Sequence, residues 1–174
     1  KILFLNKFKF PSEIKYGNIV KKKLCNINSA DNIFCSHVVE HVSFSEAKIA
    51  LDNIYQMLKP GGNFRIIVPS LKARVDEYLD TKDANLFMNS LGCVNEDENK
   101  GIIAKTRFLF GNSRHKWMYD DISLYNMLIE QGFKNIRKCI FGDSGLNIFS
   151  EVENIDRFIE NDGKYKAVAF HCSK

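Results

Sequence analysis

The hydrophobic positions of the chain change their period along its length, and each change marks an element. Residues 31–37 (DNIFCSH) form a short apolar run, which is typical of a buried strand. Residues 43–62 carry apolar side chains at helical spacing, with Ser43 or Ser45 as the cap and Pro-Gly-Gly as the stop. Residues 63–70 (NFRIIVPS) predict a second strand. A strand, a helix and a strand in this order form a βαβ unit and predict a parallel sheet covered by helices.

The rest of the chain continues the same alternation. Further elements are predicted as a strand at 13–20, helices at 72–80 and 120–133, and strands at 134–142 and 164–174. The polar stretch at about 90–105 carries Gly and Asn, and we expect it to cover an active site. No repeat or low-complexity linker divides the chain, so the sequence predicts one domain over residues 1–174.

Composition narrows the class of protein without deciding it. The 174 residues are 45% hydrophobic, which suffices for a substantial core. The net charge of +4 is weaker than that of a dedicated nucleic-acid binder, so no nucleic-acid partner is expected. The five cysteines form no C-x-x-C pair, which indicates reduced thiols and a cytoplasmic location. No apolar run reaches the roughly 20 residues that a membrane span needs.

The string CSHVVEH contains the pattern H-x-x-E-H at His37, Glu40 and His41. On one continuous helix this pattern is a zinc-peptidase signature. Here it directly follows a predicted strand, so the two histidines have no assured common face, and we expect no metal site. The carboxyl end of a strand in an α/β sheet is instead where ligands bind. A plainer alternative is a capping role for His41 and a solvated carboxylate at Glu40.

The longer string DNIFCSHVVEHVSFSEAKIALDNIYQMLKPGGNFRIIVPSL resembles strand 4 to strand 5 of class I S-adenosylmethionine-dependent methyltransferases. In that family "EH" follows the fourth strand and "LKPGG" precedes the fifth. The later string FGNSRHKWMYDDISLYNMLIEQGFKNIRKCIFGDS is similar to a bacterial subgroup linked to cell-surface polysaccharide biosynthesis. The resemblance runs from about residue 11 to the end. It implies a Rossmann-like α/β sandwich with a mostly parallel sheet, and S-adenosylmethionine as cofactor with S-adenosylhomocysteine as product.

The chain departs from the family at its start. The G-x-G-x-G loop that lets the backbone approach the cofactor is absent, and so is the acidic residue of the second strand. We therefore expect an N-terminally incomplete domain whose first two strands and Gly-rich loop precede Lys1. The alternative is a non-catalytic, methyltransferase-like binding module that has lost the loop.

The resemblance implies roles for individual residues on the cofactor side. Asn18 and Ile19 correspond to the end of the third strand, where a polar side chain contacts adenine. Ser36 and His37 leave the fourth strand where the family's chain passes the methionine part of the cofactor. A side-chain amide such as that of Asn18 can both accept and donate a hydrogen bond to adenine.

The acceptor side is expected to combine two strings, HVVEH and SRHKWMYD. Histidine can take a proton from a hydroxyl or amine during methyl transfer, which makes His41 and His115 the catalytic candidates. The substrate-binding candidates are Glu40, Arg114, Trp117 and Tyr119. Trp117 and Tyr119 could instead pack as a hydrophobic staple before the next helix. The implied reaction is S-adenosylmethionine-dependent methyl transfer to a small-molecule or carbohydrate-linked acceptor, and a zinc hydrolase is the less favoured alternative. The sequence does not predict the oligomeric state.

Overall fold

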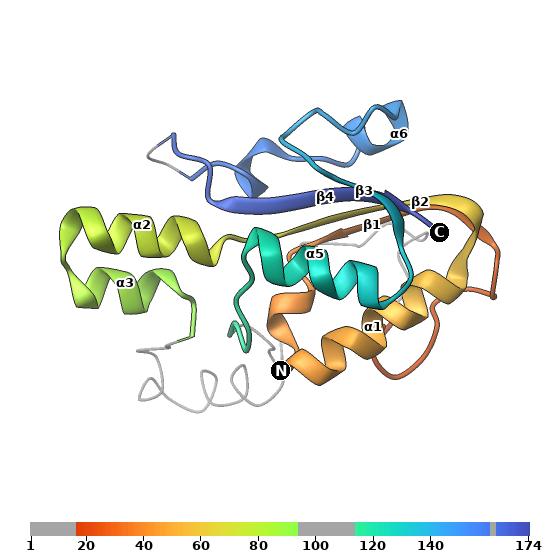
Figure 1. The fold of residues 1–174 in the computed structure, drawn as a ribbon, viewed down its shortest axis with the longest axis horizontal. Coiled ribbons are helices and arrows are strands. Elements are labelled where there is room, and N and C mark those ends of the chain that lie inside the picture. The colour runs from red at the N-terminus through yellow and green to blue at the C-terminus, as the bar shows by residue number, and fades with distance from the viewer. Residues whose placement is uncertain (1–16, 94–113, 161–162) are drawn as a thin grey trace, which may run out of the picture.

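A computed structural model of the chain describes residues 17–93, 114–160 and 163–174. Its centre is a four-stranded sheet in the order β1-β2-β4-β3. The strands are β1 (Ala30–Ser36), β2 (Leu58–Pro69), β3 (Lys134–Lys138) and β4 (Ala167–Ser173). Figure 1 shows helices α1 and α5 on one side of this sheet and the segment that carries α6 on the other.

The described sheet is mixed, which corrects the expectation of a mostly parallel one. Strands β1 and β2 pair in parallel, as the βαβ unit requires. Strand β4 runs antiparallel to both of its neighbours, β2 and β3. The period of the hydrophobic residues identifies a strand but does not give its direction, so the sequence pattern alone could not reveal this arrangement.

The predicted βαβ unit is confirmed, with a shifted boundary. Helix α1 (Phe44–Met57) starts with a capping box, in which the backbone N–H of Glu46 donates to Ser43 Oγ and that of Ser43 donates to Glu46 Oε2. These bonds satisfy backbone donors at the helix start that would otherwise lack partners. The Pro-Gly-Gly segment lies inside β2 and not at the helix end. Gly61 adopts a left-handed φ of 75° beside a register shift between β1 and β2.

The remaining predicted elements are largely present. Helix α2 (Leu71–Thr81) and helix α5 (Asp121–Glu130) confirm the predictions at 72–80 and 120–133, whereas β3 and β4 are shorter than predicted. Among the described residues, the elements that were not predicted are α3 (Ala84–Ser90), α6 (Asn147–Ser150) and two 3-10 turns at Val39–His41 and Ile155–Arg157.

Two predicted segments fall partly outside the described residues. Residues 17–20 of the predicted strand 13–20 form a turn instead, because Asn18 Oδ1 accepts from the backbone N–H groups of Val20 and Lys21. Residues 13–16 and most of the predicted cover at 90–105 lie outside the described part of the chain.

The strands divide their side chains between two cores. In β2, Phe64, Ile66 and Val68 belong to a large cluster with α1 and α5, while Ile67 faces a smaller cluster on the other side. This alternation follows the two-residue period of a strand. The smaller cluster includes Phe158 and so ties the segment after β3 to the sheet. None of the described helices is long and apolar enough to cross a membrane.

Candidate functional site

A pocket of about 200 Å³ lies at the carboxyl ends of β1 and β2. Its lining residues come from six places in the chain: His37, Pro69, Arg74, His115, residues 156–160 and Lys166. Parallel strands place their carboxyl ends at one edge of a sheet, and ligands bind there in open α/β folds. The pocket therefore has the location that the strand-end interpretation of HVVEH predicted.

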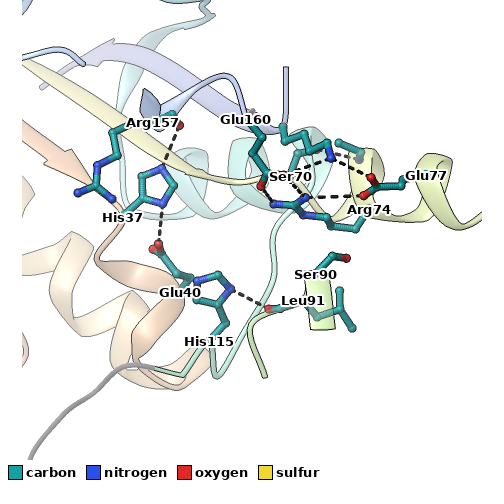
Figure 2. Close-up of polar contacts among 12 residues, drawn as sticks. His37, Glu40, Ser70, Arg74, Glu77, Ser90, Leu91, His115, Arg157 and Glu160 are labelled. Atoms are coloured by element: carbon teal, nitrogen blue, oxygen red, sulfur yellow. Dashed lines mark hydrogen bonds and ion pairs between the residues drawn. The ribbon is translucent and has the colours of Figure 1, made fainter. Parts of the chain in front are cut away.

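His37 turns the chain sharply away from β1. Its backbone N–H donates to the carbonyl oxygen of Ile67 at 2.9 Å, and its φ of 54° lies in the left-handed region. Such a backbone is uncommon for a residue with a side chain and clusters at functional sites. Nε2 of the ring donates to the carbonyl oxygen of Arg157 at 3.0 Å, since a carbonyl can only accept (Figure 2). Nδ1 lies 3.2 Å from Oε1 of Glu40.

Glu40 connects the exit of β1 with the segment that carries His115, and it is inaccessible to solvent. Its carbonyl oxygen accepts from the backbone N–H groups of Lys116 at 2.7 Å and Trp117 at 3.2 Å. Its carboxylate lies near His37 and 3.8 Å from Nε2 of His41. Neither carboxylate oxygen accepts a hydrogen bond from the described residues. A buried carboxylate with so little compensation is costly and calls for a positive partner.

His41 and His115 lie against one another, with ring centroids 5.1 Å apart and an interplanar angle of 61°. Nδ1 of His41 donates to the carbonyl oxygen of Arg114 at 3.1 Å, and Nδ1 of His115 donates to that of Leu91 at 2.8 Å. Burial lowers the pKa of His115 below its usual value of 6.5, and the bond to Leu91 opposes this shift. Both rings therefore carry the Nδ1 proton when neutral, and Nε2 carries the lone pair.

A charged cluster forms the opposite wall of the pocket, and the sequence did not predict it. The two terminal guanidinium nitrogens of Arg74 donate to the carboxylate of Glu160, and Nζ of Lys166 lies 3.1 Å from Glu160 and 2.9 Å from Glu77 (Figure 2). Arg74 and Lys166 are both buried. The members lie far apart in the sequence, so no local spacing reveals them. We assign the cluster a structural role, because the charges balance one another.

The residues predicted on the cofactor side have different environments. The two hydrogen bonds that Asn18 Oδ1 accepts within its own turn saturate that oxygen, so an adenine contact would use Nδ2. Ile19 packs its side chain against the large core cluster, and its carbonyl oxygen accepts from Asn53 Nδ2 at 2.7 Å. Ser36 ends β1 with a buried Oγ that has no hydrogen-bond partner among the described residues.

The predicted substrate-binding residues separate into two groups. Tyr119 is completely buried in the large core cluster, so the structure corrects its assignment as a surface that contacts substrate. It precedes the cap of α5 and shares that cluster with Leu124, as a hydrophobic staple would. Trp117 is 44% exposed and packs on Phe44 with ring centroids 4.9 Å apart. Arg114 is half-buried, and its carbonyl oxygen orients His41.

Comparison with known proteins supports a methyltransferase fold. A family model described as a methyltransferase domain matches residues 7–66, about a third of the chain. A SAM dependent methyltransferase from Archaeoglobus fulgidus has a TM-score of 0.50 at 14% identity, over 92% of this chain and 66% of that one. A chain from the complex of a methyltransferase with its activator from Haloferax volcanii has a TM-score of 0.50 at 10% identity, over 90% and 58%. No curated protein matched the sequence.

These likenesses establish the architecture. The described residues adopt the mixed α/β, Rossmann-like fold of S-adenosylmethionine-dependent methyltransferases. The chain spans less than two thirds of the length of the structures that it matches, so it corresponds to a part of their fold.

Proposed function

We propose that the chain transfers a methyl group from S-adenosylmethionine to a small-molecule or carbohydrate-linked acceptor. The methyltransferase domain match and the shared fold support the reaction class. The observation that carries the proposal is the polar pocket at the carboxyl ends of β1 and β2, with His37 and His115 in its wall. One fold can host many chemistries, so the function is inferred from this site and not from the fold alone.

The residues at the end of β1 fit the cofactor. Ser36 Oγ is buried without a partner in the described part of the chain, and a buried hydroxyl of this kind is costly unless a ligand bonds to it. S-adenosylmethionine presents amine, carboxylate and hydroxyl groups that can fill this requirement. In this proposal Ser36 and the backbone at His37 hold the methionine part, and Nδ2 of Asn18 is left to reach the adenine.

The pocket fits the acceptor. A volume of about 200 Å³ holds a small molecule or one end of a larger one. Its wall includes the imidazole of His115, which can accept a hydrogen bond, and the guanidinium of Arg157, which can donate one, and both suit the hydroxyl groups of a sugar or another polar acceptor. Precursors of cell-surface polysaccharides have this chemistry. The five cysteines are all free, in keeping with a reduced, cytoplasmic setting for such a reaction.

Methyl transfer requires alignment, exclusion of water and removal of a proton. When bound, the cofactor supplies an electrophilic methyl group on a sulfonium. The protein positions the acceptor, and alignment of this kind can supply a large share of rate enhancement. Burial lowers the pKa of His115, which favours the neutral ring, and the Nε2 of that ring can accept a proton. His41 is not among the residues that line the pocket and would act through His115.

The test is acceptor-dependent release of S-adenosylhomocysteine by the purified chain. The protein is incubated with S-adenosylmethionine and a panel of sugar nucleotides, free sugars and small phenols. We expect one class to give turnover, and His115→Gln to reduce the rate about a hundredfold. Ser150→Ala, which changes an exposed residue far along the chain, is the matched control and should leave the rate unchanged.

Two results would contradict this proposal. Turnover that is insensitive to His115→Gln would remove the histidine from the reaction. A chain that binds the cofactor and transfers methyl to no acceptor of the panel would be the non-catalytic binding module instead.

A further inference from the structure

The side chains of Glu40, His41 and His115 converge at the edge of the pocket. Each offers one ligand atom, and these atoms all lie within 4.8 Å of one another. We infer that the three residues bind a divalent transition-metal ion. Two imidazoles and a carboxylate form a common donor set for such ions in proteins, as in catalytic zinc sites that keep a further position open.

The hydrogen bonds of both histidines have the pattern of metal ligands. A coordinating imidazole usually donates its other N–H to a carbonyl or carboxylate, which fixes the tautomer and aims the lone pair. Here Nδ1 of His41 donates to Arg114 and Nδ1 of His115 donates to Leu91, both through backbone carbonyls. Nε2 is therefore the nitrogen that coordinates in each ring. The two carbonyls come from separate segments, so tertiary structure sets both orientations.

The carboxylate of Glu40 provides an independent argument. It is 0% exposed, and neither oxygen accepts a hydrogen bond from the described residues. His37 cannot supply one while neutral, because its only proton is on Nε2 and is donated to Arg157. An isolated buried carboxylate is unfavourable, whereas one that coordinates a cation is compensated. A divalent ion between Glu40 and the two histidines would supply the missing charge.

The separations are compatible with coordination after small side-chain movements. Ligand atoms around a tetrahedral zinc ion, at bond lengths of about 2.0–2.1 Å, lie roughly 3.4 Å from one another. Nε2 of His41 lies 3.8 Å from Oε1 of Glu40. This pair would therefore have to approach by only about 0.4 Å to match a tetrahedral site.

The inferred site differs from the zinc-peptidase pattern in its ligands. That pattern would use His37 and His41 from one helix, but here the two residues belong to a strand exit and a 3-10 turn. His37 directs Nε2 toward Arg157 and lies outside the converging set. Its place is taken by His115, which comes from a segment distant in the sequence. The sequence motif thus pointed to two of the ligands and missed the third.

The position of the site indicates what the ion would bind next. His115 lines the pocket, so an open coordination position would face the acceptor. This step rests on the proposed methyl transfer. A hydroxyl of the acceptor would bind the ion, which would lower the pKa of that hydroxyl and favour loss of its proton to water. The histidines would then act as ligands and not as the base, and acceptors with an oxygen nucleophile would be preferred.

The test measures metal binding without cofactor or acceptor. The purified chain is treated with a chelator, dialysed, and titrated with Zn²⁺ by calorimetry and with Co²⁺ by visible absorption. We expect one ion per chain. The visible spectrum should be that of a Co²⁺ ion bound by two nitrogens and an oxygen in a site of low symmetry. Glu40→Gln, His41→Gln and His115→Gln should each weaken binding by more than about tenfold, since even the loss of an outer partner costs that much.

His171, one of the four histidines of the chain, provides the matched control. His171→Gln removes one imidazole from the far end of the sheet and should leave the affinity unchanged. Circular dichroism of each variant confirms that the fold is retained. Absence of stoichiometric binding by the wild-type chain would overturn the inference. So would equal binding by the wild type, His41→Gln and His115→Gln, because it would place the ion elsewhere.

The result is separable from the proposed function. If Zn²⁺ binds but S-adenosylmethionine does not, the metal site stands and methyl transfer fails. If the cofactor binds and turnover survives a chelator with wild-type activity, methyl transfer stands and the metal site has no part in it.

Discussion

The backbone N–H of Lys116 donates to the carbonyl oxygen of Glu40 at 2.7 Å. This bond joins the two strings, HVVEH and SRHKWMYD, that the sequence identified separately. It places His41 and His115, each adjacent to one of the bonded residues, in ring contact. The histidines are therefore positioned by the main chain of both segments, which favours a defined geometry over a mobile one.

Replacement of Tyr119 by Phe should leave the protein as stable as the wild type or up to about 1 kcal/mol more stable. The hydroxyl is buried and has no hydrogen-bond partner among the described residues, so its removal relieves a desolvation cost. Urea unfolding of both proteins measures the difference. A clear loss of stability would show that the hydroxyl has a partner in the rest of the chain.

Replacement of Arg65 by Met should destabilise the protein by about 3–5 kcal/mol. Its guanidinium forms a fully buried ion pair with Glu153 and donates to the carbonyl oxygen of Ile140 at 2.9 Å. Loss of one partner leaves the other charge buried without compensation. The double variant with Glu153→Gln should lose less than the two single changes together, which a double-mutant cycle in urea would measure. Strict additivity would mean that the two side chains do not interact.

Replacement of Ser43 by Ala should cost about 1 kcal/mol. Ser43 Oγ accepts from the backbone N–H of Glu46 and completes the capping box of α1. Thermal unfolding compares this variant with Ser150→Ala, whose exposed side chain makes no such bond and should leave the transition unchanged. Equal transitions in all three proteins would rule out a contribution from the cap.

Replacement of Glu160 by Gln should lower stability at neutral pH and lose its effect in acid. The hydrogen bond from Arg74 is the main cause that lowers the pKa of Glu160 below its usual value of 4.5, and Lys166 adds to it. A carboxyl group with a lowered pKa stabilises the fold above its ordinary pKa, and the contribution is lost as the pH falls through the lowered value.

The measurement is urea unfolding of the wild type and Glu160→Gln between about pH 7 and pH 3. The effect should be small, because the carboxylate is 45% exposed and solvent screens it. Glu151→Gln, at an exposed position, is the control and should show no such convergence. A difference that grows toward acid would contradict the assignment to Arg74.

Local patterns were sufficient for the elements with a clear period. The strand at 31–37, the helices at 72–80 and 120–133 and the cap at Ser43 all follow from spacing and terminal residues, and the structure confirms them. The direction of β4 and the short helices were not predictable, because tertiary packing decides them. Residues 17–20 resembled a strand end, but Asn18 Oδ1 accepts from the backbone N–H groups of Val20 and Lys21 and forms a turn.

The sequence identified the two segments HVVEH and SRHKWMYD, but it did not identify the residues from other parts of the chain that line the pocket beside them. Polar residues at the exit of β1 pointed to the edge of the sheet at which the pocket lies. The aromatic residues were misleading, since Tyr119 fills the core while its neighbour Trp117 lies at the surface. Arg74 and Arg157 line the pocket from segments without a motif, so only the folded chain brings them to it.

The central claim is that the chain binds S-adenosylmethionine at the carboxyl end of β1, and calorimetric titration of the purified chain tests it most directly. We predict saturable binding at one site, with affinity near micromolar and weakened by Ser36→Val, which fills the position of the buried hydroxyl with a methyl group. Ser150→Ala should bind as the wild type does. No heat of binding with either S-adenosylmethionine or S-adenosylhomocysteine would contradict the account and leave a methyltransferase-like module that binds something else.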